Sequence, residues 1–101
     1  MSHTVIVSPE ARAQLDQLYD YIAAAASPDT ALRFNNDILD HLEGLQDFPI
    51  RGTARDDILH GLRTVGFRRR LTIAFVVEPV TVFVVGIFYG GQDFEAMLRG
   101  E

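Results

Sequence analysis

The sequence of 101 residues contains no cysteine, no tryptophan and no lysine. Without cysteine, the chain has no disulfide, no thiolate metal ligand and no cysteine nucleophile, so its fold must depend on packing alone. The longest apolar run, residues 82–89, is far shorter than the roughly 20 residues of a membrane-spanning helix. The first residues also lack the basic and apolar regions of a secretory signal. We therefore expect a cytoplasmic protein that does not associate with a membrane.

The remaining composition is that of an ordinary globular protein. Hydrophobic residues make up 48% of the chain, and seven Phe and three Tyr supply large side chains for a core. A chain of this size buries about 60–70% of its unfolded surface, which suits one core. We expect residues 1–101 to form a single domain, because the sequence has no linker, internal repeat or low-complexity tract.

Charge is distributed unevenly along the chain. The net charge of −5 argues against a protein that coats nucleic acid, and we expect no direct DNA binding. Residues 51–75 reverse this sign, with six arginines against two acids. Because all nine basic residues are arginine, this segment offers planar donors suited to carboxylate or phosphate groups. These arginines either bind an anionic partner or pair with the acidic first half of the chain.

Two helices are predicted in the first half of the chain. The β-branched run at residues 4–7 predicts a strand, and Ser8-Pro9 then favours a helix start, a signal that recurs at Ser27-Pro28. The short connection between the helices predicts an antiparallel hairpin. Apolar spacing predicts a buried stripe on each helix, formed by Ala11, Leu15, Leu18 and Ile22 and by Ala31, Phe34, Ile38, Leu42 and Leu45. The residues on other faces of the first helix include Gln14, Gln17 and Tyr21.

The second half of the chain predicts a sheet. Residues 51–57 have no periodicity and are expected to form a surface loop. Residues 62–65, 71–77 and 80–89 predict three strands, and the last is apolar on both faces, which indicates a place inside the sheet. The element order is β-α-α-β-β-β. We therefore predict an α+β fold, in which an N-terminal strand and an antiparallel helix hairpin pack on a twisted, mainly antiparallel sheet.

Common metal, cofactor and nucleophile motifs are absent from the sequence. The histidines at positions 3, 41 and 60 lie in separate segments without a second ligand at metal spacing, and each is expected on the surface or in a loop. Gly90-Gly91 lacks the rest of a phosphate-binding loop, and no serine lies in a nucleophile elbow. We expect neither a metal nor a cofactor.

One group of residues offers chemistry. Arg63 and residues 68–70 lie on and between the first two strands of the predicted second-half sheet, while Tyr89 and residues 90–94 follow from the last strand. If these regions meet, the arginines hold a phosphate, and Tyr89 stacks on a base or assists proton transfer during RNA cleavage. Alternatively, Tyr89 packs at the sheet edge and Gly90-Gly91 forms a turn.

Several segments together resemble the RelE/ParE superfamily of bacterial toxins, and more closely its ParE-like branch. The resemblance covers nearly the whole chain, and the matching segments are Ser8-Pro9-Glu10-Ala11 with Leu15 and Tyr19-Asp20-Tyr21-Ile22, Phe48-Pro49-Ile50-Arg51-Gly52, Gly61-Leu62-Arg63, residues 70–75 and residues 87–94. It implies a RelE/ParE-like fold and a toxin that is silenced by an antitoxin wrapped around it. ParE-like members act on DNA gyrase, whereas RelE-like members cut messenger RNA on the ribosome.

Charge favours the ParE-like branch. RelE-like toxins are strongly basic and usually place a basic or catalytic side chain on the last strand. This chain has a pI near 5.0 and no basic residue in positions 76–98. The resemblance therefore predicts a non-enzymatic toxin that binds DNA gyrase and is neutralised by a ParD-like antitoxin. The alternatives are a ribosome-dependent endoribonuclease, with Tyr89, Arg63 and Arg70 as catalytic residues, and an inactive remnant.

Contact residues are predicted for both partners. The residues expected to contact the target are Arg63, Arg68, Arg69, Arg70, Tyr89, Gln92, Asp93 and Phe94. The residues expected to contact the antitoxin are Leu32, Leu39, Arg51, Arg55, Arg68, Arg69 and Arg70. The two leucines flank the buried stripe of the second helix, where they either offer apolar surface to a partner or join the core. The arginines suit the acidic segments of a disordered antitoxin tail.

Overall fold

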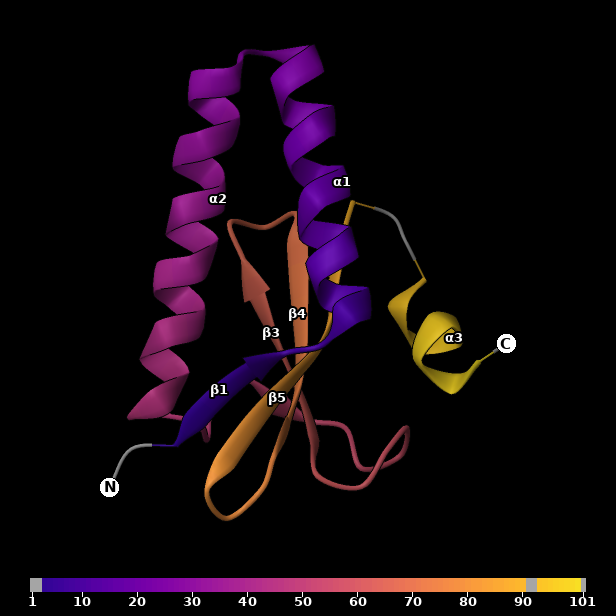
Figure 1. Ribbon diagram of the computed structural model, residues 1–101. Helices are drawn as coiled ribbons and strands as arrows, with labels where there is room; N and C mark the ends of the chain where they lie inside the picture. Colours follow the sequence, from indigo (N-terminus) through magenta and orange to yellow (C-terminus); the bar gives the residue numbers. More distant parts are fainter. Residues whose placement is uncertain (1–2, 91–92, 101) are drawn as a thin grey trace.

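The computed structural model describes residues 3–90 and 93–100. Two helices form a hairpin on one face of a five-stranded sheet, and a short third helix lies apart from them (Figure 1). The elements are β1 (Thr4–Val7), α1 (Pro9–Ala25), α2 (Pro28–Glu43), a 3-10 turn (Gly44–Gln46), β2 (Thr53–Ala54), β3 (Leu62–Phe67), β4 (Leu71–Val77), β5 (Thr81–Tyr89) and α3 (Phe94–Arg99). The predicted α+β class is confirmed.

Both long helices begin as the sequence predicts. The Ser8 hydroxyl accepts a hydrogen bond from the Ala11 backbone N–H at 3.0 Å, and the Ser27 hydroxyl accepts one from the Thr30 N–H at 3.1 Å. A proline follows each cap, where its missing N–H costs nothing. These caps fix where each helix starts, so the two-residue connection turns the chain back into an antiparallel pair.

The strands lie in the order β1-β5-β4-β3-β2. β1 pairs with β5 in parallel, and the other neighbours pair antiparallel, which confirms the mainly antiparallel sheet. β5 lies between β1 and β4, as its two apolar faces predict. Its helix-facing side joins the main core, which comprises Ala11, Leu15, Leu18, Ile38, Leu42, Leu45, Leu71, Ile73, Phe75, Val82, Val84 and Ile87.

A bulge in β5 changes which residues face the helices. Ala74 pairs with Gly86 but Phe75 pairs with Val84, which leaves Val85 as the extra residue. The side chains on the helix side therefore shift from Val82 and Val84 to Ile87. Gly86 is required beside this bulge, because a Cβ there would lie 2.4 Å from the Phe88 ring.

Two elements escape the sequence-based prediction. The polar segment at residues 51–57 is not a loop throughout, because Thr53 and Ala54 pair with β3 as the edge strand β2. The third helix, α3, packs Phe94 and Leu98 on the other face of the sheet, against a second small core of Leu62, Ala74 and Phe88. The predicted strand at 62–65 also extends to Phe67. Each missed segment is short, so periodicity carries little signal there.

Candidate functional site

The turn between β3 and β4 carries three consecutive arginines. Phe67 pairs with Leu71, so residues 68–70 form the turn itself. Arg68 and Arg69 have φ angles of 49° and 67°, in the left-handed region where glycine or asparagine is usual. A side chain in this region costs about 1–2 kcal/mol per residue. The fold holds charged side chains in a turn whose backbone would suit glycine better.

Arg68 is the anchored member of this turn. Its guanidinium forms an ion pair with Asp37 of α2 and lies 5.4 Å from the centroid of the Phe34 ring and 5.3 Å from that of Phe67. This contact bears out pairing with the acidic half of the chain for one arginine. Arg69 and Arg70 are exposed, and neither takes part in a salt bridge within residues 3–90 and 93–100.

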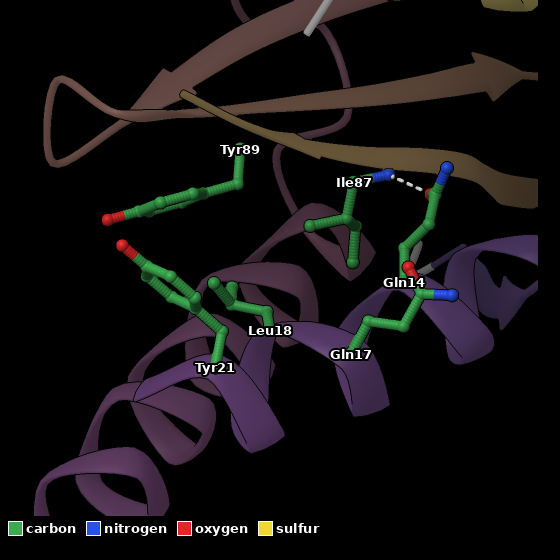
Figure 2. A pocket seen from close by; sticks show the side chains of 6 residues that line it. All are labelled: Gln14, Gln17, Leu18, Tyr21, Ile87 and Tyr89. Carbon is green, nitrogen blue, oxygen red and sulfur yellow. Dashed lines mark hydrogen bonds between the residues drawn. The ribbon is translucent and has the colours of Figure 1, made fainter. Parts of the chain in front are cut away.

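The end of β5 lies beside this turn. The Gly90 backbone N–H donates to the Arg70 carbonyl at 2.8 Å, and Leu71 pairs with Tyr89. The structure therefore brings residues 68–70 together with Tyr89, as predicted. The ring of Tyr89 lies 5.8 Å from that of Tyr21, centroid to centroid, and Figure 2 shows both hydroxyls pointing to the same side.

A pocket opens between α1 and this end of β5. It is lined by Gln14, Gln17, Leu18, Tyr21, Ile87 and Tyr89 (Figure 2). The Gln14 side chain turns toward the sheet, and its Oε1 accepts a hydrogen bond from the Ile87 backbone N–H at 2.6 Å. The helical periodicity of α1 predicts Gln14, Gln17 and Tyr21 on faces away from the buried stripe. Their own spacing of three and four residues is the signal that marks a second, neighbouring stripe on α1.

Arg63 is not part of this cluster. It lies near the start of β3, opposite Ala54, whereas the arginine turn follows the end of that strand. Its Nε donates to the Arg51 carbonyl at 2.7 Å, and its Nη2 donates to the Gly52 carbonyl at 3.3 Å. Arg63 thus holds the segment that leads into β2. Arg51 lies in the same segment, with its guanidinium 5.7 Å from the Phe48 ring centroid.

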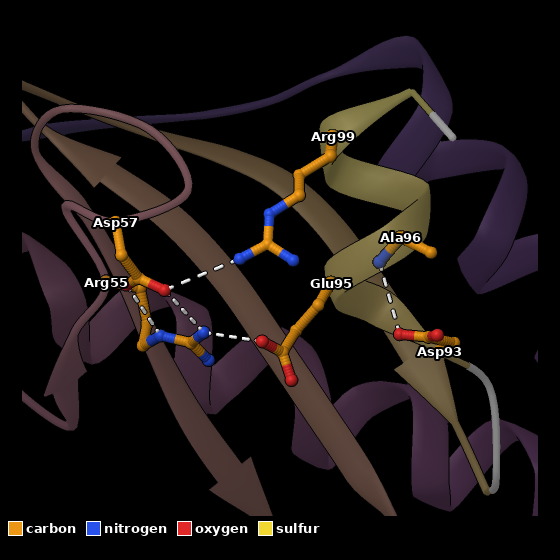
Figure 3. A network of polar contacts seen from close by, with 6 residues as sticks. All are labelled: Arg55, Asp57, Asp93, Glu95, Ala96 and Arg99. Atoms are coloured by element: carbon orange, nitrogen blue, oxygen red, sulfur yellow. Dashed lines mark hydrogen bonds and ion pairs between the residues drawn. The ribbon is translucent and has the colours of Figure 1, made fainter.

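Arg55 belongs to a polar network that joins the loop before β3 to α3 (Figure 3). Its guanidinium donates to both Asp57 oxygens at 2.9 Å and to Glu95 at 2.6 Å, while Arg99 lies 3.6 Å from Asp57. The hydrogen bonds that Arg55 donates, first to Asp57 and then to Glu95, raise the pKa of Arg55, and the bond from Arg55 lowers the pKa of Asp57. This network fastens α3 to the sheet.

Two of the contact residues predicted after β5, Asp93 and Phe94, stabilise α3. Asp93 caps α3 by accepting a hydrogen bond from the Ala96 N–H at 3.1 Å. The Phe94 ring lies 6.0 Å from that of Phe88, within the second core. Gln92 lies outside the described residues. Asp93 and Phe94 therefore belong to α3 and its cap, which lie on the face of the sheet away from the helix hairpin.

Leu32 and Leu39 stay on the surface of α2. Their side chains are 51% and 42% exposed, so burial in the core, the alternative for these residues, does not occur. His41 departs from its predicted surface or loop position, because it lies in α2 beside the Phe67 ring. Its buried Nε2 has no hydrogen-bond partner among the residues that the structure describes. Burial and the charge of Arg51 lower the pKa of His41.

Residues 3–90 and 93–100 contain no group of three or more His, Cys, Asp or Glu that would hold a metal ion. No helix within the same residues has the length and apolar character needed to cross a membrane.

Comparisons with known proteins identify similar chains. Residues 5–94 match the family model described as "ParE toxin of type II toxin-antitoxin system, parDE". A solved structure described as the chromosomal ParDE TA system from P. aeruginosa has a similar fold, with a TM-score of 0.76 and 24% sequence identity. The similarity covers 88% of this chain and 97% of that chain. A comparison with curated proteins found no match.

Proposed function

The chain belongs to the ParE toxin family of type II toxin-antitoxin systems, and on this premise we propose that it inhibits DNA gyrase by direct protein contact. We further propose that it acts in the cytoplasm and is neutralised by a ParD-like antitoxin. The fold and the family support a toxin that works together with an antitoxin. The choice of gyrase follows from the resemblance to ParE-like toxins, and the choice of protein contact over catalysis rests on the arrangement of charged and aromatic side chains at the β3–β4 turn.

The observation that carries this proposal is the exposed pair Arg69 and Arg70 beside Tyr89. These arginines have no internal ion pair in the described residues, and the fold retains them in a strained turn. Guanidinium groups and tyrosine rings are enriched among the residues that dominate protein interfaces. Inhibition by contact needs only such a surface, whereas catalysis needs acid, base and phosphate-binding groups around one point.

The endoribonuclease alternative has less support from the geometry. Its predicted catalytic residues were Tyr89, Arg63 and Arg70. Arg70 lies near Tyr89, but Arg63 lies at the far end of β3 with two of its donors directed at backbone carbonyls. RNA cleavage at Tyr89 would therefore rely on the arginine turn alone to hold the phosphate.

Gyrase inhibition is tested by adding the purified chain to a plasmid supercoiling assay. We expect inhibition by the wild type and at least tenfold weaker inhibition by the double variant Arg69→Ala/Arg70→Ala. The matched control Arg12→Ala/Arg33→Ala removes the same charge from the exposed helix surface and should retain inhibition. A ribosome-programmed cleavage assay runs in parallel. Scission of messenger RNA without any effect on supercoiling would replace this proposal with the alternative.

We propose that the antitoxin covers the surface that joins α2 to the arginine turn. Leu32 and Leu39 supply exposed apolar side chains, and residues 68–70 supply charge that complements an acidic tail. Calorimetric titration of the triple variant Arg68→Ala/Arg69→Ala/Arg70→Ala should show antitoxin affinity at least tenfold below that of the wild type. Unchanged affinity would remove the arginines from this surface.

A further inference from the structure

The pocket between α1 and the end of β5 has a buried floor and an aromatic wall. Leu18 and Ile87 form its floor, and these residues are only 7% and 2% exposed. The rings of Tyr21 and Tyr89 stand at one end of the pocket (Figure 2). The ring centroids lie 5.8 Å apart with an angle of 52° between the ring planes, and Tyr21 is 59% exposed. A partner therefore approaches the pocket from solvent along the Tyr21 ring.

Two glutamines form the opposite end of the pocket (Figure 2). Gln14 is fixed in place, because its Oε1 accepts the hydrogen bond from the Ile87 backbone N–H. Gln17 is exposed beside it. A wall that is held by a hydrogen bond in the free chain keeps its shape, so a partner does not have to order this end of the pocket when it binds.

The volume of the pocket limits what it can hold. Its free space is about 250 Å³. Sites for drug-sized ligands and cofactors occupy about 300–1,000 Å³, whereas an apolar cavity of about 150 Å³ accepts one benzene ring. The pocket therefore suits a single ring and not a whole cofactor. Its lining also favours a ring, because aromatic side chains pair with one another in offset or edge-to-face arrangements.

The arginine turn lies at the tyrosine end of the pocket. Leu71 pairs with Tyr89, and the Gly90 N–H donates to the Arg70 carbonyl, so the turn is adjacent to the residue that carries this ring. Arg69 and Arg70 are exposed and form no salt bridge within the described residues. An acidic group beside the bound ring complements this positive charge.

We propose that this pocket is the socket by which the toxin holds gyrase, and that its occupant is one aromatic side chain of gyrase with an acidic residue beside it. The inference rests on the proposed inhibition of gyrase by contact. The ring of gyrase packs on the floor of the socket against the two tyrosine rings, and the acidic residue pairs with the arginine turn. A few anchors of this kind, set in pockets that exclude water, contribute most of the binding energy at protein interfaces.

Two small probes test the socket without gyrase. Phenylpropionate carries a ring and a carboxylate, whereas phenylpropanol carries the same ring without a charge. In NMR titrations at millimolar concentration, we expect both probes to shift the signals of Leu18 and Ile87, and phenylpropionate to bind at least threefold more tightly. Arg69→Ala/Arg70→Ala should abolish this preference. Absence of a shift with either probe overturns the socket, and equal affinity of the wild type for both overturns the acidic neighbour.

The second experiment measures inhibition in the plasmid supercoiling assay. Tyr21→Ala removes one ring of the aromatic wall, so we expect at least tenfold weaker inhibition. Tyr21→Phe keeps the ring and should inhibit within twofold of the wild type. Because Tyr21 is exposed and alanine favours a helix, urea denaturation should show that Tyr21→Ala remains folded. Phe48→Ala removes an exposed ring outside the pocket, and this matched control should inhibit as the wild type does.

The outcomes separate this inference from the proposed function. Equal inhibition by Tyr21→Ala and the wild type overturns the socket and leaves gyrase as the target. A tenfold loss in Tyr21→Phe also overturns it, since the hydroxyl and not the ring would then make the contact. A wild type that binds both probes but does not inhibit gyrase overturns the proposed function, and gyrase as the occupant with it.

Discussion

The arginines at the two ends of β3 have opposite surroundings. Beyond the end of the strand, Arg69 and Arg70 are exposed in a strained turn and form no salt bridge within the described residues. Near its start, Arg63 and Arg55 direct their guanidinium groups at backbone carbonyls and at acidic side chains. The same residue type thus builds structure at one end and presents free charge at the other.

The difference between the ends shows why a charge count cannot locate a binding surface. Segment 51–75 has a surplus of arginine, yet Arg55 and Arg63 near β2 already donate hydrogen bonds to groups within the chain. A guanidinium with internal partners must break those bonds before it binds anything else. Arg69 and Arg70 of the arginine turn avoid that cost, which makes them the better contact surface.

The largest effect is expected where α3 packs on the sheet. Phe88 is 4% exposed beneath α3 and contacts Phe94. Replacement of such a ring by alanine leaves a cavity, and we expect Phe88→Ala to lower the free energy of unfolding by about 3–5 kcal/mol. Urea denaturation measures this loss. Phe48, which is 65% exposed, is the matched control, and Phe48→Ala should change stability little. Equal losses in both variants would show that α3 does not cover a real core.

A smaller effect of opposite sign is expected at the arginine turn. Arg69→Gly removes a side chain from a left-handed position, so stability should rise by about 1 kcal/mol. The same variant should weaken antitoxin binding, because it also removes an exposed charge. Arg70→Gly is the control, since Arg70 has no positive φ and gains no such relief. Denaturation midpoints and calorimetry give the two values. A destabilised Arg69→Gly would show that the turn is not strained.

Much of the fold could be predicted from the sequence because its signals are local. Ser8-Pro9 and Ser27-Pro28 mark the helix starts, and apolar spacing marks the core faces. The α3 helix has no such local signal, because it is only six residues long. It is held by contacts with other segments: Phe94 packs in the second core, and Arg99 forms an ion pair with Asp57. A short helix of this kind is stabilised by tertiary contacts rather than by its own propensity.

The candidate site could be predicted in part, because some of its contacts follow from strand pairing that local patterns predict. The hairpin register brings residues 68–70 and Tyr89 together, and that register follows from two strands of predictable length. The roles of Gln14 and Tyr21 depend on where α1 crosses β5, which no local pattern specifies. Arg63 is separated from Tyr89 because it pairs with Phe75, far from the turn, whereas Tyr89 pairs with Leu71 beside the turn. The segment that Arg63 holds includes β2, a two-residue strand that periodicity cannot detect.

A still smaller effect on stability is expected in acid, at the polar network of Arg55 and Asp57. Because Arg55 lowers the pKa of Asp57 below its usual 3.8, this carboxylate stabilises the folded state above that pH. The contribution is lost as the pH falls through the lowered pKa. The stability difference between wild type and Asp57→Asn should therefore be present at pH 7 and shrink as the pH falls below 3.8. A difference that persists in strong acid would assign the effect to packing instead.

The smallest effect concerns His41 of α2, which lies beside the Phe67 ring at the base of the arginine turn. Burial, and then the charge of Arg51, lower the pKa of His41 below 6.5, so the unfolded chain binds a proton more readily than the folded chain. The contribution of the neutral His41 ring to the stability of the folded state is complete above pH 6.5, and it declines as the pH falls below 6.5. His41→Gln should remove this decline in urea denaturation between pH 7 and pH 5. Arg51→Gln should only reduce it, because burial of the ring remains. A full loss of the decline in Arg51→Gln would mean that charge, and not burial beside Phe67, sets the protonation of His41.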